Sequence, residues 1–494
     1  MRTLALIKRS ASVSMAVAAI GLAHTPAFGQ DYTHPREMNL PAPGFDPPDP
    51  ARHRVSLPGG LTAYVVEESR VPLVTLSAFA GSGSAADPAA ARALERALRS
   101  RGPQGREGGA FAEALRRMAA EYRVEISPEM TEITLSVPAA DAGEALELLA
   151  ALLRTPAIHE DDVTALRQQA ERASLPSASA TGESGPVLYE GSLGFAVERF
   201  NALLLEGHPY GGQPSPEQAR TLTAERVRGF HARHFVPQNV VLAVAGDLPR
   251  ADAVAAIERS FAGWSGEAPP TPRAAPRVAT RAPRRIHSYE ADKLQAWVVM
   301  GQEIPPVPLA DQAALEVMNY ILGGGHFDTR LFREVRDKRG LANTAGGFPE
   351  PGVRGPGSYT FRSYGRPEVV PFLIEIMQRE ITRIRAEPVS EEELRIAQGA
   401  LADGVFPMRF EDGHATARTY AQEWLQHRSH ERTASYPRRI RAVTPRDVQA
   451  AARKYLDPER MQIVLVGPIE KVRAGSHPEG KLRLEDFGAL IPGR

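Results

Sequence analysis

The chemistry that this sequence could carry centres on its 13 histidines, because histidine is a common zinc ligand and a general base near neutral pH. Two pairs have the i, i+3 spacing of one helical face, His231 with His234 and His427 with His430. Neither of the helical zinc motifs H-E-x-x-H and H-x-x-E-H occurs in the chain. We interpret the first pair as packing residues, since they share a predicted helix face with apolar side chains. The second pair is expected at the surface, in a region rich in Arg, Ser and Glu.

The residues needed for other kinds of catalysis are also incomplete. There is no G-x-S-x-G turn for a serine nucleophile, and the chain has no cysteine, which excludes a thiolate nucleophile, a thiolate metal site and a disulfide framework. Gly323, Gly324 and Gly325 form a run between two predicted helices, but the run lacks the Lys-Ser/Thr of a phosphate loop. Such a run permits close approach of the backbone to a ligand or to a neighbouring element, and both interpretations stay open. Asp328 or Thr329 is predicted to cap the helix that follows.

The elements that would position these residues are laid out twice along the chain. Residues 223–246 and 444–467 align without a gap at an offset of 221 residues. Each segment reads as a threonine N-cap, an amphipathic helix, a turn proline and an apolar strand closed by glycine. This period is far too long for a solenoid and indicates domain duplication. We therefore predict an α+β fold of two duplicated domains, each an antiparallel-rich sheet layered with helices.

Composition and the N-terminal segment narrow the class of protein. The chain has 494 residues, 43% of them hydrophobic, and a formal charge of +0, which allows two sizeable cores and predicts no nucleic-acid partner. Residues 1–29 place Arg2, Lys8 and Arg9 ahead of a short apolar stretch and end in Ala-Phe-Gly, so we predict a cleaved secretory signal peptide and a secreted, periplasmic protein. That stretch is too short to cross a bilayer, and no membrane span is predicted elsewhere.

Further boundaries follow from pattern and composition. They are an extended N-terminal arm over 30–54, an N-terminal domain over 55–264, a Pro/Arg linker over 265–285, a C-terminal domain over 286–478 and a tail over 479–494. Inside the N-terminal domain, residues 174–186 are rich in Ser, Ala and Gly and are predicted to form a mobile loop.

Segments in a fixed order over residues 50–478 resemble the pitrilysin/insulinase family of zinc peptidases, in its separate-subunit bacterial branch. They are Leu-Pro-Gly-Gly-Leu at 57–61, Gly-Ser-Gly-Ser-Ala-Ala-Asp-Pro at 81–88, His-Pro-Tyr-Gly at 208–211, Val-Pro-Gln-Asn at 236–239 with Ala-Gly-Asp at 245–247, the block 323–341, and 443–445 through 466–468. The resemblance implies one half of a clamshell of the processing-peptidase type, which pairs with a second chain to enclose a peptide chamber.

The helix that carries H-x-x-E-H in active members of the family lies over residues 87–102 here. Beyond the turn residue Asp87 it contains one carboxylate, Glu95, and no histidine. Zinc cannot be held by that set, because a catalytic zinc site needs about three protein ligands. The resemblance therefore implies no catalytic residue, metal ligand or cofactor in this chain, with zinc expected only in a partner chain.

In the non-catalytic half, the resemblance implies a substrate-orienting arginine and, seven residues later, a tyrosine. The arginine position matches Arg336, whereas the tyrosine position is Asn343, which can form hydrogen bonds but is shorter than a phenol. Gly323, Gly324 and Gly325 complete the predicted substrate-binding set. A solvated helix arginine, or one in an ion pair, is the alternative interpretation of Arg336.

Three hypotheses of function follow. The preferred one is a catalytically inactive subunit that pairs with a zinc-bearing homologue, or with a second copy of itself, to form a peptide-degrading chamber. The second is a non-proteolytic scaffold or peptide-binding protein on the same fold, which Asn343 favours. The third is a self-sufficient zinc metallopeptidase, which requires a metal site that the sequence does not display.

Overall fold

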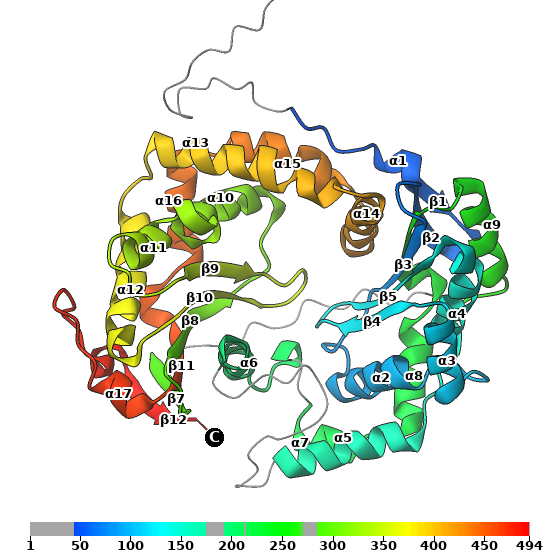
Figure 1. The fold of residues 1–494 in the computed structure, drawn as a ribbon, viewed down its shortest axis with the longest axis horizontal. Coiled ribbons are helices and arrows are strands. Elements are labelled where there is room, and N and C mark those ends of the chain that lie inside the picture. The colour runs from blue at the N-terminus through cyan, green and yellow to red at the C-terminus, as the bar shows by residue number, and fades with distance from the viewer. Residues whose placement is uncertain (1–43, 174–191, 212–213, 268, 270–283, 494) are drawn as a thin grey trace, which may run out of the picture. The chain divides into compact units, whose positions relative to one another are not determined.

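Two six-stranded sheets organise the described part of this computed structural model (Figure 1). It describes residues 44–173, 192–211, 214–267, 269 and 284–493. The first sheet has the order β1-β2-β6-β3-β5-β4, with β1 (Arg54–Ser56), β2 (Thr62–Glu67), β3 (Leu73–Ala80), β4 (Glu121–Ile126), β5 (Thr131–Pro138) and β6 (Val240–Gly246). The second has the order β12-β7-β11-β8-β10-β9, with β7 (Arg285–Glu290), β8 (Ala296–Ile304), β9 (Ala345–Glu350), β10 (Gly357–Gly365), β11 (Gln462–Gly467) and β12 (Ala489–Pro492).

Each half surrounds its sheet with helices. Those of the first half are α1 (Pro50–His53), α2 (Pro88–Ser100), α3 (Gly109–Arg117), α4 (Ala142–Arg154), α5 (Glu160–Ala173), α6 (Leu193–Leu204), α7 (Pro216–Arg220), α8 (Ala224–His234) and α9 (Arg250–Ser260). Those of the second half are α10 (Leu309–Asn319), α11 (Arg330–Phe332), α12 (Val370–Ala386), α13 (Glu391–Gly399), α14 (Gly413–His427), α15 (Glu431–Arg441), α16 (Pro445–Tyr455) and α17 (Ile469–Arg473). Most pack on the sheet of their own half or on one another, whereas α6 and α14 pack on the sheet of the other half.

The internal repeat is confirmed as a pair of matching units. The hydroxyls of Thr223 and Thr444 cap α8 and α16 by accepting hydrogen bonds from backbone N–H groups three residues on. Each helix leads to a central strand, β6 or β11, that runs parallel to one neighbour and antiparallel to the other. Gly246 and Gly467 end these strands at φ of 136° and 147°, a backbone conformation that favours glycine. The predicted α+β fold of two duplicated domains is thereby confirmed.

Two helices are exchanged between the halves. Helix α14, from the second half, packs on β2, β3 and β6, where its Tyr420 and Leu425 contact Tyr64 and Phe79 of the first sheet (Figure 1). Helix α6, from the first half, packs on β8 and β11 of the second sheet, chiefly through Phe195 and Phe200. Because each sheet buries one face under a helix of the other half, the residues Gly44–Arg494 form one compact unit.

The turns of two hairpins also join the halves. Glu129, between β4 and β5, accepts hydrogen bonds from the backbone N–H groups of Arg354 at 2.7 Å and Gly355 at 3.2 Å, between β9 and β10. The hydroxyl of Tyr210 donates to the same carboxylate. Gly355 is required there, because a Cβ at that position would lie 2.2 Å from the Tyr210 ring.

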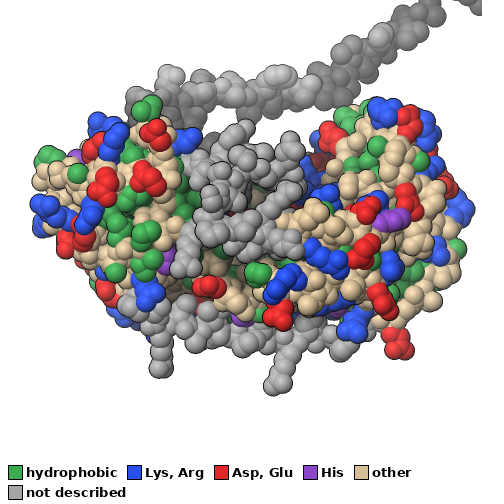
Figure 2. Space-filling model, turned by 90° about the horizontal axis from the view of Figure 1, so that it is seen from below, with side chains coloured by type: hydrophobic (Ala, Val, Ile, Leu, Met, Phe, Trp, Pro, Cys, Tyr) green, Lys and Arg blue, Asp and Glu red, His purple; other side chains and the backbone are tan. Residues whose placement is uncertain are grey.

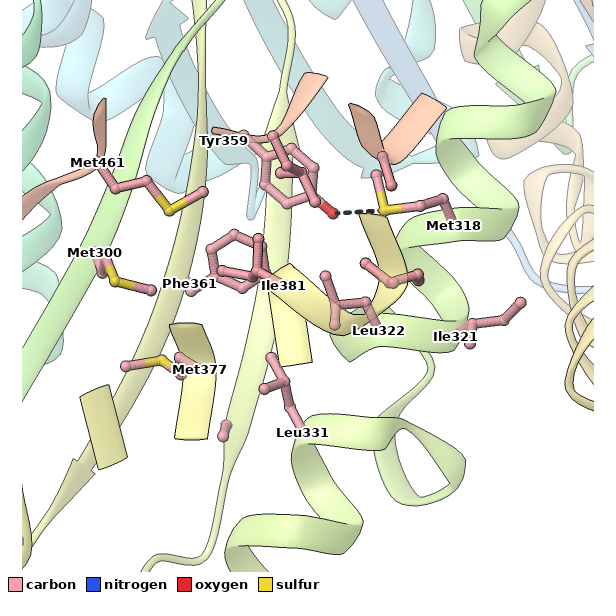
Figure 3. Close-up of a cluster of buried hydrophobic side chains, with 14 of the residues drawn as sticks. Met300, Met318, Ile321, Leu322, Leu331, Tyr359, Phe361, Met377, Ile381 and Met461 are labelled. Carbon is pink, nitrogen blue, oxygen red and sulfur yellow. Dashed lines mark hydrogen bonds between the residues drawn. The ribbon is translucent and has the colours of Figure 1, made fainter. Parts of the chain in front are cut away.

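The core of the second half anchors the elements that matter for function. Figure 3 shows Leu331, from α11, directed toward the same cluster as Phe361 of β10 and Ile381 of α12. These side chains are fully buried, and burying a side chain of this size stabilises the fold by about 1.5–3 kcal/mol. The hydroxyl of Tyr359 in this cluster donates to Asn319 at 2.6 Å, so the buried phenol keeps a partner.

Three segments differ from their predicted form. The arm predicted as extended over 30–54 contains helix α1 in its described part, because Asp49 caps it and a proline occupies its first position. The segment 479–494, predicted as a tail, contributes β12, which pairs in parallel with β7. Helix α15 was not among the predicted elements, and it contains Pro437, a residue that usually breaks a helix. The signal peptide, the loop 174–186 and most of the linker 265–285 lie outside the described residues.

The described surface mixes charges of both signs. Figure 2 shows acidic and basic side chains interspersed on the face that it presents, which agrees with the formal charge of +0. Among the described residues, no helix has both the length and the apolar character needed to cross a membrane.

Candidate functional site

Helix α2 is the helix on which the resemblance implies the zinc motif of active members, and in this chain it is built for packing. Asp87 caps it by accepting from the Ala90 N–H at 3.1 Å, and its inner face is made of apolar residues, mainly alanine, that are buried against the core. Its one carboxylate, Glu95, forms ion pairs with Arg92 at 3.2 Å and Arg99 at 2.9 Å. Two arginines of the same helix therefore neutralise the only anionic donor that α2 could offer a cation.

Histidines that the structure describes are used in packing and in hydrogen bonds, as His231 illustrates. His231 is buried, and its Nε2 lies 3.0 Å from the carbonyl oxygen of Leu153. Burial lowers the pKa of His231 to about 4, so it is neutral at physiological pH, and its interpretation as a packing residue is confirmed. In the part of the chain that the structure describes, no three His, Asp or Glu side chains come together as a metal-binding group.

His430 corrects the expectation of a surface location. Its side chain is 14% exposed, and its Nε2 lies 2.7 Å from the hydroxyl oxygen of Tyr64. The ring also packs edge-on against Tyr64 and Tyr420, at centroid distances of 5.4 and 5.2 Å. Tyr64 belongs to β2, 366 residues away in sequence, and the sequence carries no signal for a contact between residues so far apart.

Arg336 lies on a short helical segment that the core holds in place. Thr329 caps α11, because its hydroxyl oxygen accepts from the Phe332 N–H at 3.1 Å, as one of the two predicted caps would. Leu331 and Val335 are fully buried on its inner side. The helix continues as a π-helical turn over Arg333–Asp337, a feature that is frequent at functional sites.

Of the basic residues on this segment, most are neutralised by two carboxylates. Arg330 is bonded to Glu393 at 2.7 and 2.9 Å. Arg339 and Lys338 are paired with Glu334, at 2.8 and 2.5 Å. Burial alone would raise the pKa of Glu334, but the hydrogen bonds from Lys338 and Arg339 hold it below its ordinary value, so the carboxylate is ionised.

Arg336 is different. Among the described residues no carboxylate pairs with it, and its guanidinium instead lies 4.9 Å from the ring centre of Phe332 and 5.5 Å from that of Phe327. Gly340, at φ 60°, ends the segment with its N–H bonded to the Arg336 carbonyl oxygen at 2.8 Å. This left-handed turn reverses the chain and brings Asn343 back beside Arg336.

The two residues line one cavity, which we name the Arg336 pocket. It has a volume of about 220 Å³ and lies where β10 ends and β8 begins. Arg336 and Asn343 line it together with Gln295, Tyr364 and Arg366. The structure thus brings the predicted pair together and adds three polar side chains that sequence reasoning missed. These three side chains reach the pocket because β8 pairs with β10 in a register that places Tyr364 opposite Trp297. No local sequence pattern specifies that register.

The glycine run lies elsewhere. Gly323 packs against the neighbouring strand β9, and a Cβ there would lie 2.6 Å from the Gly347 nitrogen. A Cβ on Gly324 would meet the Asn319 amide at 2.3 Å, and one on Gly325 would meet the Tyr320 ring at 2.6 Å. Their neighbours inside the protein therefore account for the run, and none of the three lines the Arg336 pocket.

A larger cavity, of about 350 Å³, lies between the first sheet and α14. Threonine and serine side chains of β3 and β5 line its sheet side, and Ser77 nearby lies 3.0 Å from Nε2 of His414. Burial lowers the pKa of His414, which favours its neutral form. Arg418, on the same helix, forms a two-point ion pair with Glu132, at 3.0 and 2.8 Å. The ion pair that lines this cavity is thus matched within the protein.

Comparison with known proteins first defines a class, the two-sheet fold of M16-like peptidases. A peptidase M16 inactive domain from Pseudomonas fluorescens has a TM-score of 0.69 at 24% identity, covering 84% of this chain and 97% of that one. A protease from Helicobacter pylori has a TM-score of 0.69 at 19% identity, covering 86% and 100%. A Streptomyces coelicolor protein named as an uncharacterized zinc protease is 27% identical over 433 residues, covering 85% of this chain and 90% of its own. One from Mycobacterium tuberculosis with the same description is 26% identical over 438 residues, covering 86% and 96%.

A family model matches part of the sequence. Residues 221–401 match the model of the peptidase M16 inactive domain, a range that includes Arg336 and Asn343. This part of the chain is therefore similar to the peptidase M16 inactive domain, and the resemblance to the pitrilysin/insulinase peptidases is confirmed.

Proposed function

We propose that this chain is a catalytically silent subunit of a two-chain peptidase. It pairs with a zinc-bearing homologue and supplies part of the wall of a chamber in which peptides are degraded. The observation that carries this proposal is the state of α2, where Glu95 is the only carboxylate and two arginines hold it. Zinc activation of water needs an open metal site with about three protein ligands, which α2 does not offer. The catalytic metal is then the partner's.

The site that this chain would contribute is the Arg336 pocket. Arg336 and Asn343 sit on a segment anchored by buried side chains, so their donors are held ready for a substrate in the chamber. The role of the glycine run in this proposal is indirect, because Gly323 allows β9 to approach the helix that precedes Arg336. The N-terminal segment 1–29 would direct the chain to the periplasm, where extracytoplasmic peptides are available.

The test is reconstitution of the full chain with a secreted homologue that carries H-x-x-E-H. We expect peptide cleavage by the pair, its loss with a chelator, and zinc only in the partner. As matched controls, Glu95→Gln in this chain should leave the rate of the pair unchanged, whereas the Glu→Gln change in the partner's motif should abolish it. Stoichiometric zinc in this chain alone, with cleavage that a chelator removes, would show a self-sufficient peptidase instead. A rate that does not change when the two chains are mixed would refute pairing with that homologue.

A non-proteolytic scaffold is the second candidate, and Asn343 is the observation that favours it. An amide at this position is shorter than the tyrosine that the resemblance implies, and it is exposed. Arg336→Ala and Asn343→Tyr distinguish the two functions in the reconstituted pair. A fall in peptide turnover with the first and a rise with the second support the peptidase subunit, whereas no effect of either supports the scaffold.

A further inference from the structure

The Arg336 pocket is lined by hydrogen-bond donors and contains no acidic side chain. Arg336 and Arg366 supply two guanidinium groups, Asn343 and Gln295 supply amides, and Tyr364 supplies a phenol. Neither guanidinium is in an ion pair with a carboxylate of the described residues. The pocket therefore concentrates positive charge that the protein itself does not neutralise.

This charge contrasts with most of the other basic residues of the segment that carries Arg336. Arg330, Lys338 and Arg339 are each paired with a glutamate within 3 Å. In the larger cavity under α14, Arg418 is likewise paired, with Glu132. Arg336 has no carboxylate partner among the described residues, whereas Arg330, Lys338 and Arg339 each have one, and it packs on two phenylalanine rings. It is therefore placed to receive an anion from outside.

We propose that the Arg336 pocket binds a carboxylate group of a peptide, and that this subunit selects peptides which carry one at the position that reaches the pocket. The proposal rests on the proposed function, since it names the substrate class of the same site. A planar guanidinium matches a carboxylate in two-point geometry, and the amide of Asn343 or the phenol of Tyr364 can donate a further hydrogen bond to it. The carboxylate is either the C-terminus of the peptide or an acidic side chain.

The volume of the pocket agrees with such a ligand. About 220 Å³ accommodates a carboxylate with the side chain or terminal residue that bears it, but not a folded domain. Arg336 and Arg366 are exposed, so the contact forms in water and its contribution is limited by solvent screening. We therefore expect a preference of about tenfold in the dissociation constant, which corresponds to about 1.4 kcal/mol.

The test uses three peptides of one sequence that carry an uncharged N-terminal dye. The first has a free C-terminus and no acidic side chain, the second is amidated and contains one glutamate, and the third is amidated with glutamine in its place. Fluorescence anisotropy measures their binding to the full chain without any partner. We expect the first or the second to bind about tenfold more tightly than the third, with the difference reduced by added salt. The peptide that is preferred identifies the source of the carboxylate.

The variants assign the preference to the pocket. The double change Arg336→Gln and Arg366→Gln should abolish it, whereas Arg395→Gln, which removes an exposed charge of α13, should preserve it. Asn343→Asp should also abolish it, because the new carboxylate would occupy the guanidinium groups, and this change leaves both arginines in place. Circular dichroism checks that each variant is folded.

Three results would overturn the proposal: equal affinities for the three peptides, no binding of any of them at millimolar concentration, or a preference that survives the double change. None of these depends on a partner. If reconstitution with a zinc-bearing homologue succeeds while the peptides bind equally, the proposed function stands and the carboxylate site fails. If the preference is present but mixing produces no peptidase, the site stands and the pairing fails.

Discussion

Replacing Arg330 by methionine should destabilise the protein, because this arginine is nearly buried and is bonded to one carboxylate. Its side chain is 6% exposed, and its Nε and Nη2 donate to the two oxygens of Glu393 at 2.7 and 2.9 Å. Methionine keeps about the length of the aliphatic stem and the helix propensity of the residue but removes both donors. The largely buried carboxylate of Glu393 then loses its main partner.

The pKa of Glu393 gives the size of the effect. Burial alone would raise this pKa, but the hydrogen bonds from Arg330 and from the backbone of Ser390 lower it from 4.5 to about 2. One pKa unit corresponds to about 1.4 kcal/mol, so ionised Glu393 contributes about 3 kcal/mol of stability at neutral pH. For a carboxyl whose folded pKa is lowered, that contribution is complete above pH 4.5 and is lost as the pH falls from 4.5 toward 2. Because Ser390 keeps its hydrogen bonds to Glu393 in the variant, Arg330→Met should cost at most about 3 kcal/mol at pH 7.

Urea denaturation at pH 7, followed by circular dichroism, measures the loss in a double-mutant cycle. In the Glu393→Gln background, where the buried guanidinium of Arg330 has already lost its carboxylate, Arg330→Met should cost less than about 1 kcal/mol or be stabilising. The same loss in both backgrounds would mean that packing of the Arg330 stem, and not the ion pair, is responsible. A loss below about 1 kcal/mol at pH 7 in the otherwise unchanged protein would refute the reasoning from the pKa.

Further predictions concern acid stability and the contacts between the halves. In the folded protein His231 has a pKa of about 4 and is neutral, whereas in the unfolded chain it takes up a proton below pH 6.5. The free energy of unfolding should therefore fall as the pH drops from 6.5 to 4. In urea denaturation, His231→Gln should remove about 3 kcal/mol of that fall. Gly355→Ala should displace the Tyr210 ring and cost about 1–3 kcal/mol in the same assay, while Gly399→Ala, on an open helix surface, should be neutral or slightly stabilising. Residues 44–267 expressed alone should bind hydrophobic dyes and lack a cooperative thermal transition, because α14 no longer covers the first sheet; co-expression of the second half should restore both properties.

Much of the fold could be predicted because local patterns decided it. The matching N-caps Thr223 and Thr444 and the glycines that end β6 and β11 are signals within some 24 residues, and both units form as expected. What failed was long-range or depended on an exception. The tail 479–494 looks polar in sequence, but its strand β12 pairs with the otherwise free edge of β7. Helix α15 accommodates Pro437, which is buried against neighbouring elements.

The site was predictable only in part, for the same reason. Arg336 and Asn343 are seven positions apart in the sequence, so the pattern that the resemblance supplies was enough to pair them. Tyr364 and Arg366 reach the pocket through the strand β10, whose register no local pattern specifies. The exchange of α6 and α14 was equally invisible, since an amphipathic helix has the same pattern whichever sheet it covers.

Two arginines six residues apart should therefore separate stability from function. Arg330 is buried with its charge matched, so its loss weakens the fold, while Leu331 and Val335 still hold the segment in the core. Arg336 is exposed, packs only on two phenylalanine rings and has no carboxylate partner among the described residues, so Arg336→Gln should change the free energy of unfolding by less than about 1 kcal/mol. If Arg336→Gln instead unfolds the protein as Arg330→Met does, Arg336 is a structural residue, and neither a substrate nor a carboxylate is needed to explain it.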